Sequence, residues 1–206
     1  MKVTFGRLGD AAVTLHATGA HALHADLEAN PVDGMTESVP ALDSVTVLYD
    51  PTRVTPDALE GQLRARLVRL TSAFTATGRV VEVPIVYDGP DVENVARLAC
   101  LSVRDVTDLH ASVTYDVAFL GFLPGFAYLA GLPDALRLPR RATPRARVPA
   151  GSVAIGGPWS GVYPLDSPGG WHLLGRTPLR FFDPHANPPV LLRPGDRVRF
   201  TRVENA

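Results

Sequence analysis

The segment RLPRRATPRARVPAG, residues 137–151, holds the side chains best suited to binding an acidic substrate. A guanidinium group pairs with a carboxylate or a carboxy-phosphate through two parallel hydrogen bonds. The prolines in this segment exclude a regular helix and predict a stiff, extended chain. Arg145 lies nearest to the proline-fixed turn, in TPR, and is the candidate for this role. Arg137, Arg140 and Arg147 are equally consistent with a solvated loop.

A second segment, LDSPGGWHLLGRT, brings a serine and a histidine close together in sequence. Asp166, Ser167 and His172 are too near one another to be identified as a hydrolase triad by spacing, and the segment has no G-x-S-x-G elbow. The favoured interpretation is an anion-binding turn, formed by Ser167 and the backbone amides of Gly169 and Gly170.

Acid–base chemistry would fall to His110 or His172, although a single histidine is more often structural. His21 and His24 lie one helical turn apart without a third ligand, so no metal site is predicted. No catalytic residue is identified from the sequence. The candidates are Arg145, Ser167 and His110.

A third segment, GFLPGFAYLAGLP, combines aromatic side chains with glycines and prolines. Phe122, Phe126 and Tyr128 predict the apolar wall of a pocket, with backbone amides supplying its polar groups. An apolar plug that closes the end of a barrel is an equally supported alternative. These three aromatics, together with Trp159 and Trp171, lie in or beside predicted loops, which favours a role as anchors of an interface.

The elements that position these residues fall into two parts. Residues 1–78 predict a small lobe with the order β-α-β-α. DAAVTLHA alternates like a strand, AHALHADLEA has a helical pattern, and DSVTVLYD is a β-branched strand. Thr55 and Pro56 then begin a second helix, in which leucines recur at helical spacing.

Residues 79–206 predict a β-rich domain. RVVEVPIVYD begins with a strand, and two short helices follow, the second capped by Ser102 and Asp105. From Thr114 onward strands and turns are expected, with strands in TYDVAFLGF, FAYLAGL, SVAIGG, GVYPL, WHLLGRT, LRFF, VLL and DRVRFTR. Many short strands without intervening helices predict a closed barrel or sandwich, so the fold class is α+β.

The composition excludes several classes of function. A net charge of −1 argues against nucleic acid or an anionic membrane as the main partner. Lys2 is the sole lysine, which excludes a P-loop lysine and an internal Schiff base. No apolar run approaches the roughly 20 residues that span a bilayer. Cys100 is the single cysteine and is predicted to be buried, and the lack of a disulfide suits the reducing cytoplasm.

Four stretches, taken in order, resemble the KipI / allophanate hydrolase subunit 1 family: GFLPGFAYLAGLP, PRRATPRARVPAGSVAIGG, SGVYPLDSPGGWHLLGRTPLRFFDP and LLRPGDRVRF. GDAAVTL and DSVTVLYDP also match, so the resemblance covers nearly the whole chain. One position departs from the pattern, since Trp159 stands where the family usually has glutamine. The best characterised role in this family is that of the B subunit of bacterial 5-oxoprolinase.

The resemblance implies an α+β N-terminal domain at residues 1–78 and a cyclophilin-like β-barrel at residues 79–206. It further implies ATP-dependent opening of 5-oxoproline, a small lactam, to glutamate, in a complex with subunits A and C. ATP would be used by the complex rather than bound by this chain alone. Two alternatives stay open: a regulatory inhibitor of a sensor histidine kinase, and a component of an allophanate hydrolase or urea amidolyase type of enzyme.

In such proteins the glycine- and proline-rich loops line a cleft of the barrel near the partner subunit. The chemistry of the residues favours Arg145 for the carboxylate of the lactam, and the Ser167–Gly170 turn for an oxyanion or phosphate. The residues expected to bind substrate are Phe122, Pro124, Gly125, Phe126, Thr143, Arg145, Gly151, Ser152, Ser167, Gly169, Gly170 and Trp171.

Overall fold

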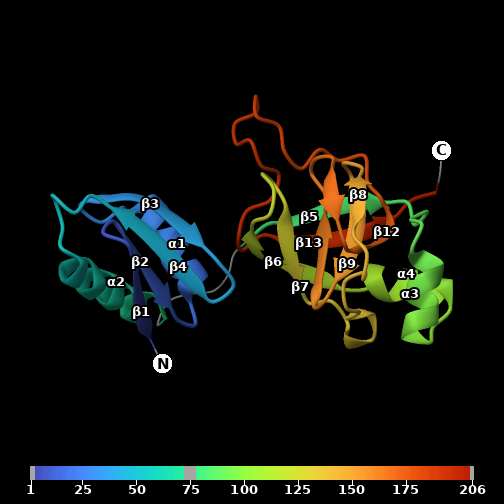
Figure 1. Ribbon diagram of the computed structural model, residues 1–206, viewed down its shortest axis with the longest axis horizontal. Coiled ribbons are helices and arrows are strands. Elements are labelled where there is room, and N and C mark those ends of the chain that lie inside the picture. The colour runs from blue at the N-terminus through green and yellow to red at the C-terminus, as the bar shows by residue number, and fades with distance from the viewer. Residues whose placement is uncertain (1–2, 72–77, 205–206) are drawn as a thin grey trace. The chain divides into compact units, whose positions relative to one another are not determined.

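The computed structural model of the chain describes residues 3–71 and 78–204. It divides into two compact units, Met1–Thr77 and Gly78–Ala206, called unit 1 and unit 2 below. Figure 1 shows helices packed on a sheet in unit 1, and a curved sheet with two helices at one end in unit 2. No helix of the described part is both long enough and apolar enough to cross a membrane.

Unit 1 is a four-stranded antiparallel sheet with two helices packed against it. The sheet has the order β1-β2-β4-β3. Its strands are β1 (Thr4–Leu8), β2 (Ala12–His16), β3 (Met35–Pro40) and β4 (Ser44–Tyr49), and its helices are α1 (Ala20–Ala29) and α2 (Pro56–Thr71).

The sequence patterns of unit 1 explain its core. Val13 and Leu15 alternate with more exposed residues along β2 and are fully buried. Leu59, Leu63 and Leu67 recur at helical spacing along α2 and are also fully buried, which confirms the predicted helix. The Thr55 hydroxyl accepts a hydrogen bond of 3.3 Å from the Ala58 backbone at the start of this helix. Strands β1 and β3, whose residues are largely exposed, were not predicted from the sequence.

Unit 2 is a seven-stranded barrel with a separate two-stranded ribbon. The barrel sheet has the order β12-β9-β10-β7-β6-β13-β5, and the ribbon pairs β8 with β11. Its strands are β5 (Val80–Ile85), β6 (Thr114–Leu120), β7 (Ala127–Ala130), β8 (Arg145–Val148), β9 (Ser152–Gly156), β10 (Trp159–Val162), β11 (Ser167–Gly169), β12 (His172–Arg176) and β13 (Arg197–Arg202). The helices are α3 (Val92–Ala99) and α4 (Val103–Ala111), with a short 3₁₀ turn η1 (Asp134–Leu136).

The two outer strands of the sheet meet and close the barrel. Val86, just after β5, and Arg176, at the end of β12, exchange two backbone hydrogen bonds of 2.9 Å. Inside, Val83, Val117 and Leu129 are fully or almost fully buried in one apolar cluster. This is the cyclophilin-like β-barrel that the family resemblance implies, and the whole chain is of the α+β class.

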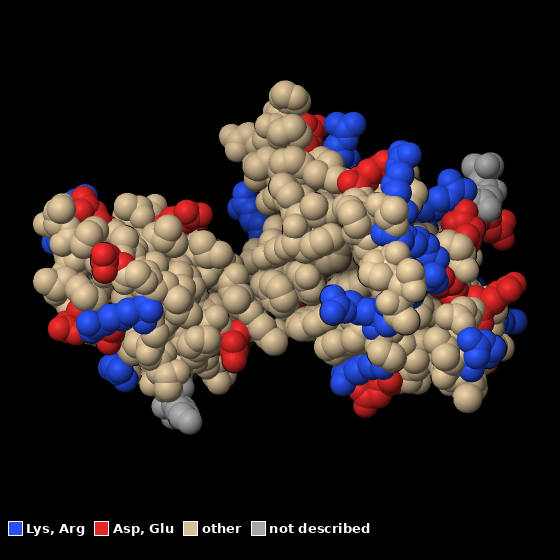
Figure 2. All heavy atoms as spheres, in the orientation of Figure 1, with Lys and Arg blue, Asp and Glu red and all other residues tan. Residues whose placement is uncertain are grey.

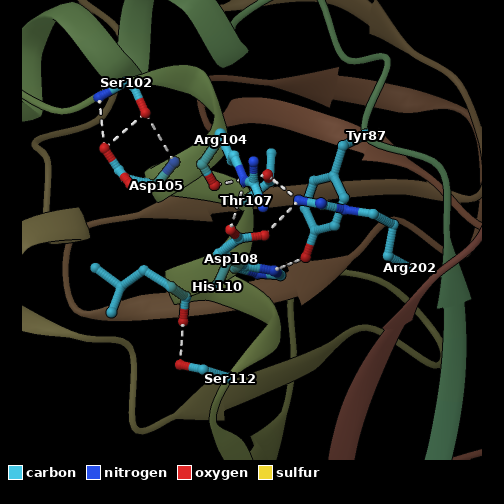
Figure 3. Close-up of polar contacts among 10 residues, drawn as sticks. Tyr87, Ser102, Arg104, Asp105, Thr107, Asp108, His110, Ser112 and Arg202 are labelled. Carbon is cyan, nitrogen blue, oxygen red and sulfur yellow. Dashed lines mark hydrogen bonds and ion pairs between the residues drawn. The ribbon is translucent and has the colours of Figure 1, made fainter.

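Helix α4 covers part of this core and begins with the predicted capping box. The Ser102 hydroxyl accepts a hydrogen bond of 3.1 Å from the Asp105 backbone. The Asp105 carboxylate in turn accepts one of 3.2 Å from the Ser102 backbone, as Figure 3 shows. Helix α3 ends at Ala99, and the residue that caps it, Cys100, has a left-handed φ of 55°. Cys100 is exposed, so the prediction that it is buried is wrong: at a helix C-terminus its side chain points off the core pattern.

Three further predictions about elements can be compared with the structure. LRFF and VLL are not strands, and they touch in a single bridge between Phe182 and Val190 within a proline-rich loop. Ser167–Gly169 is not a turn, because it forms strand β11 and pairs with β8. The extended conformation predicted for the arginine-rich segment is correct, and its second half is strand β8.

Candidate functional site

A cleft of about 240 Å³ opens on unit 2 beside the β8–β11 ribbon. Aromatic rings, prolines, glycines and one arginine form its walls. The residues that line the cleft are Phe122, Phe126, Tyr128, Arg140, Pro144, Tyr163, Pro168, Gly169, Gly170 and Trp171. All three glycine- and proline-rich segments singled out in the sequence contribute to it.

The aromatic rings of the cleft pack edge to face against one another. Phe126 lies at the centre, 1% exposed, with ring centroids 5.2 Å from Tyr128, 5.3 Å from Tyr163 and 5.4 Å from Trp171. Such edge-to-face geometry is favourable for aromatic pairs and fixes the positions of the rings. Phe122 also packs edge to face on Phe126, at 5.5 Å between ring centroids, but it is 60% exposed and has a left-handed φ of 69°. The cleft therefore has a rigid aromatic wall and one exposed ring.

Glycines allow these rings to lie directly on the backbone. A Cβ atom on Gly169 would lie 2.4 Å from the Tyr163 hydroxyl. A Cβ atom on Gly156 would lie 2.7 Å from the Trp171 ring. Atoms cannot approach so closely. Any residue other than glycine at either position would therefore displace the ring beside it. The high glycine content of this region thus follows from the construction of the aromatic wall.

Next to the cleft, two arginines share one buried carboxylate. Asp91 is 4% exposed at the side chain, and its Oδ1 accepts hydrogen bonds of 2.7 Å from both Arg141 and Arg145. Its Oδ2 accepts one of 2.8 Å from the Leu173 backbone. Burial by itself raises the pKa of Asp91, but the hydrogen bonds from Arg145 and Leu173 outweigh it and hold the pKa below its ordinary value. Asp91 is therefore a carboxylate that neutralises one of the two arginines.

This arrangement bears directly on Arg145. Its guanidinium was predicted to bind a substrate carboxylate, whereas the structure pairs it with a carboxylate of the chain itself, and Arg145 does not line the cleft. Asp91 was not identified from the sequence as a partner of the two arginines. Asp91 lies 50 residues from Arg141 and 54 from Arg145, so no local sequence pattern could predict these ion pairs.

The structure separates Ser167 from Gly169 and Gly170, the other residues of the predicted anion-binding turn. Ser167 is 7% exposed in β11, and its hydroxyl has no hydrogen-bond partner among the described residues. It does not line the cleft, whereas Gly169 and Gly170 do. Because Ser167–Gly169 is a paired strand, the predicted turn is wrong, and the anion-binding role of the Gly169 and Gly170 amides stays a prediction.

His110 lies inside the barrel core, away from the residues that line the cleft. Its Nδ1 is 2.8 Å from the Tyr87 hydroxyl, a contact drawn in Figure 3, and its Nε2 is 2.9 Å from the Ser160 hydroxyl. Complete burial lowers the pKa of His110 to about 3, so the imidazole is neutral. His110 thus has the environment of a structural histidine. His172 is also buried, and its Nε2 donates to the Pro139 carbonyl at 2.9 Å.

Besides Arg145 and Ser167, five more of the predicted binding residues lie outside the aromatic cleft. Pro124 and Thr143 are exposed, and Gly125 is buried against Phe181 and Phe182. Ser152 is buried in β9, and Gly151 lines a different hollow of about 420 Å³. The predicted residues that do line the aromatic cleft are Phe122, Phe126, Gly169, Gly170 and Trp171.

The structure adds residues that were missed in the sequence and changes the role of others. Tyr163 and Arg140 line the cleft, and the proline and glycine neighbours of Tyr163 were the available signal for it.

Phe126 and Trp171 are 1% and 8% exposed, so the prediction that they anchor an interface with another chain is wrong. They pack within the chain because the glycines leave room for them.

Charged side chains surround this site. Figure 2 shows basic and acidic side chains interspersed over the visible face of unit 2. The pairs include Arg147 with Asp166, at 2.6 Å, and Arg176 with Asp88, at 2.7 Å. Most of the positive charge in this region is therefore balanced locally by carboxylates of the same chain.

Known proteins share the whole of this architecture. The family model for the carboxyltransferase domain, subdomain C and D, matches residues 3–192. The 5-oxoprolinase B subunit of Bacillus subtilis is 41% identical over 196 residues, which cover 89% of this chain and 82% of the relative. The protein of the same name from Escherichia coli O157:H7 is 50% identical over 173 residues, or 81% and 77% of the two chains.

A solved structure is similar to this chain over its whole length. The crystal structure of TTHA0988 superposes with a TM-score of 0.82 at 41% identity. The match covers all of this chain and 40% of TTHA0988, which is therefore a longer protein. Because the family model spans both units and the loops of the cleft, this chain belongs to the family of carboxyltransferase domains, subdomain C and D.

Proposed function

We propose that this chain is the B subunit of an ATP-dependent 5-oxoprolinase, which opens the lactam 5-oxoproline to glutamate, and that its aromatic cleft forms part of the substrate site. The observation that carries the proposal is the cleft itself, because it combines flat apolar walls with an arginine. The two relatives that bear the name of this subunit support it, at 41% and 50% identity over most of their lengths.

The residues of this chain suit binding and orientation rather than ATP chemistry. The cleft, at about 240 Å³, is smaller than the roughly 300–1,000 Å³ of pockets for drug-sized ligands, and a nucleoside triphosphate does not fit it. The sole lysine, Lys2, does not belong to a phosphate-binding loop. We therefore assign ATP binding to other subunits and give this chain the task of holding the lactam ring against its aromatic wall.

The assembly we propose contains subunits A and C beside this chain, working in the cytoplasm. Within it, Arg145 and Ser167 can take part in the chemistry only where another subunit reaches them, since neither lines the cleft. His110 is enclosed by the core and takes no part in the proposed chemistry.

Reconstitution tests the proposal. The purified chain is mixed with candidate subunits A and C, and 5-oxoproline-dependent ATP hydrolysis and glutamate formation are measured. We expect turnover from the three-subunit mixture and none from the chain alone. Turnover by the isolated chain, or its absence from a mixture that forms a stable complex, would contradict the proposal. In the second case, inhibition of sensor histidine kinase autophosphorylation and hydrolysis of allophanate are the assays for the two alternatives.

A further inference from the structure

Five arginines lie between residues 137 and 147, and the structure separates one of them from the rest. Four form ion pairs with carboxylates of the chain: Arg137 with Asp134, Arg141 and Arg145 with Asp91, and Arg147 with Asp166. The fifth, Arg140, has no ion pair or hydrogen bond with any residue that the structure describes. Arg140 is also the one that lines the aromatic cleft.

The charge of Arg140 is not balanced inside the cleft. None of the described residues that line the cleft is acidic. The Tyr128 hydroxyl likewise has no hydrogen-bond partner within residues 3–71 and 78–204. Tyr128 and Arg140 line the same cleft, and burial raises the pKa of Tyr128 while the charge of Arg140 acts in the opposite direction. The cleft thus offers a guanidinium and a phenol as free donors beside apolar rings.

We propose that Arg140 binds the carboxylate of a small ring-shaped ligand, while the aromatic wall holds the ring. A guanidinium without a protein partner presents paired donors that match a carboxylate. Phe122, which is 60% exposed, and the half-buried Tyr128 supply the apolar contact area for the ring of the ligand, and the buried rings of Phe126, Tyr163 and Trp171 support them. The volume of about 240 Å³ limits the ligand to a small molecule.

This assignment rests on the proposed function and makes it specific, because 5-oxoproline is a five-membered lactam that carries one carboxylate. It replaces Arg145 by Arg140 as the residue that recognises the acid. The guanidinium of Arg145 is held by Asp91, and its release would leave a buried carboxylate with fewer donors. A cationic ligand, which aromatic walls can also bind, is disfavoured by the positive charge of Arg140.

A double-mutant cycle between protein and ligand tests the assignment on the full chain. Binding is followed by calorimetry and by tryptophan fluorescence for three probes: 5-oxoproline, 2-pyrrolidinone, which has the same ring without the carboxylate, and inorganic phosphate. We expect Arg140→Ala to weaken binding of 5-oxoproline by about tenfold or more, and to leave binding of 2-pyrrolidinone unchanged. Arg140→Lys should give an intermediate loss, because lysine keeps the charge without the paired donors.

Arg147→Ala is the matched control, since it removes the same charge from the same segment at a side chain that is 77% exposed and lies outside the cleft. The thermal melting temperature of each variant shows that it is folded. Equal effects of the two alanine variants would overturn the assignment. Equal losses for both lactam probes in Arg140→Ala, tighter binding of phosphate than of 5-oxoproline, or no saturable binding of 5-oxoproline to the wild-type chain would overturn it as well.

The outcomes also separate this assignment from the proposed function. Binding that depends on Arg140, in a chain that gives no turnover with subunits A and C, would keep the carboxylate site and reject the oxoprolinase. Turnover by the reconstituted complex with a KM for 5-oxoproline that Arg140→Ala does not change would keep the enzyme and reject the role of Arg140.

Discussion

At the scale of single residues, the chemistry of this chain is decided by how its charges are paired. Asp91 accepts hydrogen bonds from two arginines and one backbone amide, and it joins the start of helix α3 to the segment that leads into β8. The sharing of one carboxylate by two guanidinium groups leaves one positive charge in excess, so the loss of Asp91 would leave two.

Asp91→Asn should therefore destabilise unit 2 by about 2 kcal/mol, the scale of charge-assisted hydrogen bonds to a buried group. The substitution keeps the shape of the side chain and removes its charge. Chemical denaturation followed by tryptophan fluorescence measures the effect. Asp166→Asn is the control, because Asp166 and its partner Arg147 are 45% and 77% exposed and such pairs contribute less than about 1 kcal/mol. Equal losses for the two variants would contradict the role given to Asp91.

His110 makes the stability of unit 2 depend on pH. Its pKa is about 3 in the folded chain and about 6.5 when unfolded, so the unfolded state binds the extra proton between these values. The contribution of neutral His110 to the free energy of unfolding is fully present above about pH 6.5, and it is lost as the pH drops toward 3. The free energy of unfolding should decrease by about 2 kcal/mol between about pH 7 and pH 5. His110→Gln should flatten this part of the profile, measured by denaturation at each pH, and an unchanged slope would contradict the assignment.

The cleft shows what could be predicted about the site from sequence and what could not. The three segments that build it were identified from glycine, proline and aromatic residues, whose local constraints are visible along the chain. The sequence could not show whether Arg140 or Arg145 is free to bind a carboxylate. The answer depends on Asp91, which lies 54 residues from Arg145 and on another element. Ion pairing of this kind is a property of the folded chain.

At the scale of elements, prediction from sequence succeeds where a pattern is long or a cap is present. The helix that begins at Pro56 and the capping box of α4 were predicted because they depend on neighbouring residues. Strands β8 and β11 were missed, since each is short and becomes a strand only by pairing with the other. LRFF looks like a strand by composition, but it finds no regular partner among the described residues.

Helix α2 offers a simple test of this local reasoning. Gly61 lies exposed within the helix, and the position of a Cβ atom there has nothing within 4 Å. Gly61→Ala should stabilise unit 1 by about 0.5–1 kcal/mol, because alanine loses less backbone entropy on folding. Gly34→Ala is the contrasting control: its φ is +77° and a Cβ would lie 2.7 Å from Val54, so it should destabilise the unit. Thermal and chemical denaturation report both changes.

At the scale of the whole molecule, each unit has its own apolar core. Val13, Leu23 and Leu59 belong to one cluster, and Val83, Leu129 and Phe200 belong to another. A unit with a closed core of its own can fold without its neighbour. The boundary expected from the sequence, between residues 78 and 79, remains a prediction.

Separate expression tests the boundary. Residues 79–206 should give a folded fragment with a single cooperative thermal transition, and should bind 5-oxoproline as the full chain does. Circular dichroism and calorimetry are the measurements, with residues 1–78 studied in parallel. A fragment that melts without a cooperative transition would show that the barrel requires unit 1 and that the boundary is misplaced.

The position of β13 has a consequence for how the barrel is made in the cell. β13 (Arg197–Arg202) lies between β6 and β5 and hydrogen-bonds to both, although it is the last strand of the sheet to be synthesised. A growing chain that has not reached Arg197 exposes the edges of both neighbours, and exposed edges favour aggregation. Ribosome-bound chains should therefore need protection by chaperones until the final strand emerges, and premature stop codons before this strand should yield insoluble product.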